Sequence, residues 1–177
     1  MSHFNLSVYI MDLNSVAWAL IVLISGSSFT LFWFLDSRMH AGLDDTPISE
    51  RELVTHRILI GTSLFMEASL VAMFWFPLLA LPFFIATFLT RLAHEFIDEL
   101  HFHMNRCTPR ETFLHVVMWL SIQIKTFAML IWGFFYQYKG VADLHPALYV
   151  WAGITFLFMA YTSYKEWFQK VERDLSI

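Results

Sequence analysis

Apolar runs of membrane-spanning length dominate this chain and restrict what it can fold into. A helix needs about 20 mostly apolar residues to cross the hydrocarbon core of a bilayer. Three runs meet this requirement directly, at 16–35, 113–135 and 148–164. Each of them is therefore predicted to form one transmembrane helix.

The apolar run from 58 to 90 is too long for a single crossing. As one helix it would extend about 50 Å, whereas the hydrocarbon core is about 30 Å thick. Pro77 and Pro82 lie inside the run, and proline ends or kinks helices. We therefore divide the run into spans at 58–76 and 80–101, joined by a tight turn near the two prolines.

The composition agrees with this organisation. Of the 177 residues, 58% are hydrophobic and 15% are charged, whereas soluble domains are about 45–50% apolar and about 25% charged. The expected fold class is all-α: a polytopic integral membrane protein, with residues 1–177 forming one bundle of five transmembrane helices. The net charge of −4 and the lack of a basic patch exclude nucleic acid as a partner. The lipid bilayer is the expected surrounding.

Lysine and arginine are divided unevenly between the two ends of the five spans. The segments on one side carry Arg38, Arg51, Arg57, Arg106, Arg110, Lys165, Lys170 and Arg173, and the other side carries only Lys139. Cytoplasmic loops of membrane proteins are enriched in lysine and arginine. This bias predicts an N-terminus outside, a C-terminus in the cytoplasm, and a location of the bacterial inner-membrane type.

Ionisable residues concentrate in the stretch from 91 to 115, RLAHEFIDELHFHMNRCTPRETFLH. At helical spacing, one face of the third span carries Thr87, Arg91, His94, Asp98, His101 and Asn105. Charged groups are costly in hydrocarbon, so this face should turn toward other helices. Counting outward from a hairpin centred near Cys107 places Glu99 level with His115.

Two N-terminal helix caps are recognisable from spacing. Thr108, Pro109 and Glu111 match a capping box with proline in the first turn, at the start of the fourth span. Ser49 and Glu52 have the same spacing and predict a short helix that leads straight into the second span.

The histidines and carboxylates of this region predict a metal site. Asp98 and His101 have the i, i+3 spacing that metal sites in helical bundles use, and His94 is one turn from Asp98. His115 would face them from the next span. The expected ligands of a non-haem iron, manganese or zinc ion are His94, Asp98, His101 and His115. Glu95, Glu99 and His56 are expected to support these ligands or to replace them.

Two other interpretations of the same histidines remain open. Haem b would need His94 and His115 to face each other across an apolar slot. Glu95, Asp98 and Glu99 would make that slot acidic, so we place haem b below a carboxylate-rich metal site. The histidines could also be residues of the membrane interface that bind no metal.

Three charged residues are expected near the middle of the membrane: Glu67, Arg91 and Lys125. The simplest arrangement is an ion pair between Glu67 and Arg91, with Lys125 close enough to contact Glu67, Glu95 or helix carbonyls. Such a pair could fix the register of the helices, or it could be part of a proton or ion pathway.

Three functions follow as alternatives. The first is a membrane protein with a His/carboxylate site open to the cytoplasm, acting as a metal-binding redox or metal-assisted component of a membrane complex, with enzymatic activity left open. The second is a proton- or ion-conducting subunit that uses Glu67, Arg91 and Asp98. The third is a non-catalytic structural or accessory subunit. The small-residue run at 25–28, SGSS, would suit contact with another membrane subunit or a second copy.

Overall fold

Five long helices build the computed structural model, which describes residues 13–43, 49–104 and 108–168. They are α2 (Ser15–Leu43), α3 (Glu50–Ala72), α4 (Pro77–Ile97), α5 (Pro109–Leu130) and α6 (Pro146–Trp167). Two π-helical segments extend them: η1 (Asp98–His103) continues α4, and η2 (Ile131–Phe135) continues α5. A short 3-10 turn, η3 (Val141–Asp143), precedes α6. The all-α prediction and the five helices are confirmed, and the described ranges contain no strand.

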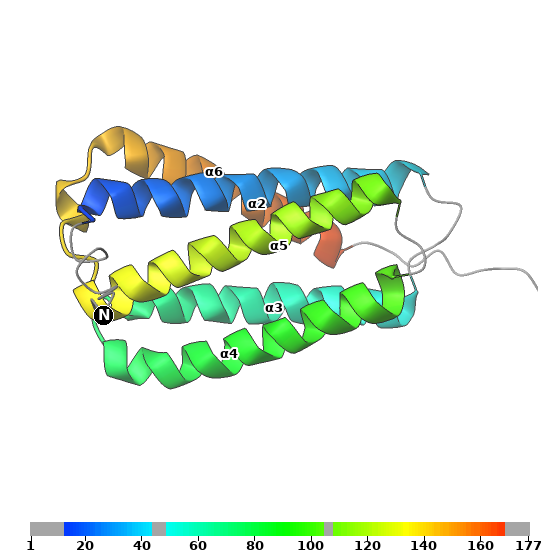
Figure 1. The fold of residues 1–177 in the computed structure, drawn as a ribbon, viewed down its shortest axis with the longest axis horizontal. Helices are drawn as coiled ribbons and strands as arrows, with labels where there is room; N and C mark the ends of the chain where they lie inside the picture. The colour runs from blue at the N-terminus through cyan, green and yellow to red at the C-terminus, as the bar shows by residue number, and fades with distance from the viewer. Residues whose placement is uncertain (1–12, 44–48, 105–107, 169–177) are drawn as a thin grey trace, which may run out of the picture.

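The helices run alternately up and down the bundle (Figure 1). α2 packs against α5 and α6, while α3 packs against α4. The alternation brings five helix ends together at one end of the bundle: the C-terminal ends of α2, η1 and α6, and the N-terminal ends of α3 and α5. We call this the histidine end, because His56, His101, His103 and His115 lie on these helix ends. The same helix ends carry five acidic residues: Asp36, Glu52, Asp98, Glu99 and Glu166.

Four of the helical stretches in the described ranges are long and apolar enough to cross a membrane: Ser15–Arg38, Pro77–His103, Pro109–Phe135 and Pro146–Trp167. Large apolar side chains cover their outer surfaces; Leu78 is 78% exposed and Leu157 is 68% exposed. This is the pattern of a multi-pass membrane protein. α3 is less apolar than the other four because Arg57 and Glu67 interrupt it, yet Met66 and Leu70 are fully buried in the bundle.

The turn between α3 and α4 lies earlier than the two prolines suggested. Residues 73–76 form it, and Pro77 is the first residue of α4. Pro82 lies inside α4, so the prediction that it belongs to the turn is wrong. Pro77 occupies the first helical position, where proline is favoured. Pro82 lies just past the first turn, and α4 continues past it although proline there removes one backbone hydrogen bond.

Both predicted N-caps are present. The Ser49 side chain accepts a hydrogen bond from the backbone N–H of Glu52 at 3.2 Å, and α3 runs without a break from Glu50. At the start of α5, Glu111 donates its N–H to Thr108 Oγ1 at 3.3 Å. Thr108 in turn donates its N–H to Glu111 Oε2 at 3.2 Å, which completes the capping box.

The small residues at 25–28 make contacts within the chain. Ser27 Oγ lies 2.9 Å from Thr155 Oγ1 and accepts a hydrogen bond from Trp151 Nε1 at 2.8 Å, which joins α2 to α6. A Cβ on Gly26 would lie 3.3 Å from the Lys125 side chain. These contacts are with α6 and α5 of the same chain, and contact of the run with another subunit or a second copy stays a prediction.

Candidate metal centre

Three imidazole rings from three helices meet at the histidine end. His56 comes from α3, His103 from η1 and His115 from α5. The centroids of His103 and His115 are 4.7 Å apart with the rings nearly perpendicular, and those of His56 and His103 are 6.4 Å apart with the rings nearly parallel. His103 is 1% exposed, so it is the ring at the centre of the group.

His56 lies between two carboxylates. Its Nε2 is 3.2 Å from Asp98 Oδ1, and its Nδ1 is 2.8 Å from Glu166 Oε1 near the end of α6. Trp33 of α2 donates its indole N–H to the same Glu166 carboxylate. Burial by itself would lower the pKa of His56, but the two carboxylates outweigh burial and raise the pKa to about 10. The side chains around His56 therefore favour a positive charge at its position.

His115 has a matching arrangement on the other helices. Its Nε2 is 3.2 Å from Asp36 Oδ1 of α2, and its Nδ1 is 2.9 Å from Glu99 Oε2 of η1. The contact with Glu99 confirms the depth expected from the sequence. Each of these two histidines is thus flanked by one carboxylate from η1 and one from an outer helix.

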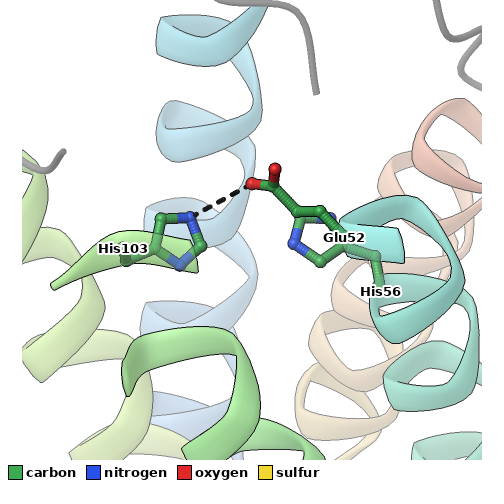
Figure 2. Close-up of side chains that lie close together, drawn as sticks. All are labelled: Glu52, His56 and His103. Carbon is green, nitrogen blue, oxygen red and sulfur yellow. Dashed lines mark ion pairs between the residues drawn. The ribbon is translucent and has the colours of Figure 1, made fainter. Parts of the chain in front are cut away.

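His103 is close to both sets of groups. Its Nε2 lies 3.6 Å from Glu52 Oε1, a contact that the dashed line in Figure 2 marks, and its Nδ1 lies 3.6 Å from Asp98 Oδ2. These separations are too long for good hydrogen bonds. Two ligand atoms that share a tetrahedral ion, each about 2.1 Å from it, are about 3.4 Å apart. The spacing of His103 and its carboxylates is therefore close to that of metal ligands.

Two groups of three side chains have the geometry to hold a metal ion. One consists of Glu52, His56 and His103, and the other of Glu99, His103 and His115. Within each group the ligand atoms all lie within 4.8 Å of one another. Each group offers two imidazoles and one carboxylate, which is the ligand set of many non-haem iron sites.

The π-helical turn decides which histidines point inward. η1 is a π-helix, in which backbone hydrogen bonds join residues five apart. The side chain of His103 also folds back along this turn, and its Nδ1 lies 3.1 Å from the carbonyl oxygen of Asp98. In an α-helix Asp98 would share its face with His101. The wider turn instead brings His103 to the inside and leaves His101 exposed.

The predicted ligands divide accordingly. Asp98 and His115 lie in the cluster, together with His56 and Glu99, which were expected as supporting groups. His94 and His101 are in neither ligand group: His94 Nδ1 lies 2.9 Å from the carbonyl oxygen of Thr90 on its own helix, and His101 stacks edge-on against Phe102. For His101 the physical reason is that the α-helical period does not continue through η1. His94 lies on α4, before η1, and its ring turns back toward the preceding turn of its own helix.

Four further residues of the cluster were not predicted as members of it: Asp36, Glu52, His103 and Glu166. A recurring pattern could have pointed to most of them. An acidic residue precedes a histidine by four positions at 36–40, 52–56, 99–103 and 111–115. At that spacing both side chains of a pair share a helix face. The side chain of His40 lies outside the described part of the chain, and Glu111 serves the α5 cap.

The charged residues at mid-bundle form two separate pairs. Lys125 Nζ lies 2.6 Å from Glu67 Oε1. Arg91 pairs with Glu95, one turn away on α4, and donates its Nε–H to Ser63 Oγ at 2.9 Å. The expected Glu67–Arg91 ion pair is therefore wrong, while the expected contact of Lys125 with Glu67 is confirmed. Glu95 serves Arg91 and is in neither ligand group.

The geometry expected for haem b does not occur in the described residues. His115 is held between Asp36 and Glu99, and His94 is bonded to its own helix. The surroundings of His115 are therefore acidic rather than apolar, which does not suit haem b.

Comparisons with family models, curated proteins and solved structures found no match to this chain.

Proposed function

We propose that this chain is a multi-pass membrane metalloprotein whose histidine end binds non-haem iron or manganese. One observation carries the proposal. The imidazoles of His56, His103 and His115 converge from three helices, and each lies close to carboxylates of neighbouring residues. Imidazole and carboxylate ligands suit iron, manganese and zinc. The excess of carboxylates over imidazoles favours iron or manganese, because oxygen-rich ligand sets are typical of these metals in helical bundles.

The proposal includes the orientation and the setting of the site. Arg38, Arg51, Arg57, Arg110 and Lys165 all lie on helix segments at the histidine end. By the positive-inside rule this end faces the cytoplasm, in a membrane of the bacterial inner type. The centre would then carry out redox or metal-assisted chemistry on a cytoplasmic or membrane-soluble compound, alone or as one component of a membrane complex.

A metal analysis of the purified protein tests this function. We expect His103→Gln to reduce the iron or manganese bound per chain at least tenfold, since loss of a central ligand removes that much metal affinity or more. The matched control is His101→Gln, two residues away in the same π-helical turn but exposed; it should bind as much metal as the wild type. Inductively coupled plasma mass spectrometry on detergent-purified protein gives the metal content. Wild-type protein without metal above background would refute the proposal, as would equal losses in the two variants.

A proton or ion pathway is a second candidate, favoured by one specific observation. Charged side chains continue from Asp98 through Glu95 and Arg91 toward the Glu67–Lys125 pair at mid-bundle. If this candidate is correct, Glu67→Gln should lower proton flux into reconstituted vesicles at least tenfold, because an intramembrane carboxyl of a relay carries the proton itself. The flux is read from a pH-sensitive dye trapped in the vesicles, with Glu50→Gln on the exposed helix start as control. Wild-type vesicles that show no flux above protein-free vesicles would exclude it.

A further inference from the structure

We infer that the centre is dinuclear, with one cation bound by Glu52, His56 and His103 and a second bound by Glu99, His103 and His115. This inference rests on the proposed function and specifies it further. His103 belongs to both ligand groups, and neither group contains both His56 and His115. Two ions that share the central ring therefore account for the arrangement better than one ion surrounded by all three.

The contacts around the two outer histidines form two equivalent half-sites. His56 lies between Asp98 of η1 and Glu166 of α6, and His115 lies between Glu99 of η1 and Asp36 of α2. The half-sites have no carboxylate in common. A histidine that binds a metal usually has its other ring nitrogen on a carboxylate, which fixes the orientation of the ring. Glu166 and Asp36 are in the position to provide this for His56 and His115.

His103 has a nitrogen on each side of its ring, and both nitrogens face carboxylates. Nε2 faces Glu52, and Nδ1 faces the side chain of Asp98. Asp98 itself reaches two rings, with Oδ1 toward His56 and Oδ2 toward His103. In the structure Nδ1 also lies 3.1 Å from the carbonyl oxygen of Asp98, to which it donates its proton. To lie between two ions the ring would release that proton to solvent or to a neighbouring carboxylate and bind as an imidazolate, with one nitrogen on each ion.

The cluster is also rich in carboxylates. The three imidazoles contact five of them: Asp36, Glu52, Asp98, Glu99 and Glu166. Dinuclear sites in helical bundles use about four carboxylates and two histidines. Two divalent cations would also offset most of the negative charge that these five carboxylates bring into the cluster.

Metal stoichiometry separates this inference from the function on which it rests. Chelated protein is reloaded with Mn²⁺, freed of excess metal, and analysed for manganese per chain. We expect about two ions in the wild type and in the control His101→Gln, and about one ion in His56→Gln and in His115→Gln. One ion in the wild type would overturn the dinuclear centre and leave the proposed metal function intact. No bound manganese or iron in the wild type would overturn both.

A second measurement needs no variant. Two Mn²⁺ ions that share a ligand are magnetically coupled, so the electron paramagnetic resonance spectrum of the loaded wild type should lack the hyperfine pattern of isolated Mn²⁺. An uncoupled spectrum that accounts for all the bound manganese would overturn the shared position of His103. The result stands whether or not the histidine variants fold.

Discussion

Replacing Lys125 with methionine is expected to destabilise the protein by about 3–5 kcal/mol, since removing one partner of a buried ion pair leaves the other charge uncompensated. Lys125 is buried on α5, and its ammonium group forms an ion pair with Glu67 on α3. Without it, the Glu67 carboxylate would have to stay charged in an apolar bundle or take up a proton. The free energy of unfolding is measured by denaturant titration in mixed micelles, followed by tryptophan fluorescence.

The matched control is Lys139→Met, which removes an exposed lysine from the loop at the opposite end of the bundle. It should change the free energy of unfolding by less than about 0.5 kcal/mol, as most exposed substitutions do. The double variant Lys125→Met with Glu67→Met should recover most of the lost stability, because replacing both members of a buried pair is often neutral. A double variant no more stable than Lys125→Met alone would show that the pair is not the reason for the loss.

Removing metal from the purified protein is expected to lower its melting temperature by about 10 °C. An ion that binds only the folded state at a thousandfold excess over its Kd adds about 4 kcal/mol, and each kcal/mol shifts the melting temperature of a chain of this size by about 2–4 °C. The effect should be large because the cluster takes side chains from α2, α3, η1, α5 and α6. Melting is followed by circular dichroism with and without a chelator.

The variant His103→Gln provides the comparison for this experiment. It lacks the ring common to both ligand groups, so its melting temperature should not respond to the chelator, while that of His101→Gln should fall as the wild type does. Equal shifts in all three proteins would mean that the chelator acts on something other than this centre.

Much of the helical architecture was predictable because it depends on local properties. Apolar runs of span length follow from the thickness of a membrane, and the Thr108–Glu111 capping box follows from two side chains three residues apart. The division of the 58–90 run was also correct. The place of its turn was not, because Pro82 is accommodated within α4 and composition does not show which of two prolines begins a helix.

The site was predictable to the extent that α-helical periodicity holds. Counting depth along the hairpin correctly put Glu99 beside His115. The same period predicted that His101 lies inside the bundle and did not predict this for His103. In η1 the positions of the two side chains are reversed. A π-turn inserts one residue into the period without a sequence signal as clear as a proline or a glycine. The face assignments within η1 are therefore displaced.

What the sequence by itself determined is which segments become helices, how many there are, and at which end the histidines gather, since these depend on hydrophobicity, spacing and charge along the chain. Only the tertiary structure decided which side chains meet. Glu166 reaches His56 across 110 residues and Asp36 reaches His115 from α2, because packing of α6 and α2 against the other helices brings them there. Contacts between helices depend on the rotation of each helix about its axis, and that rotation is set by all the packed faces together.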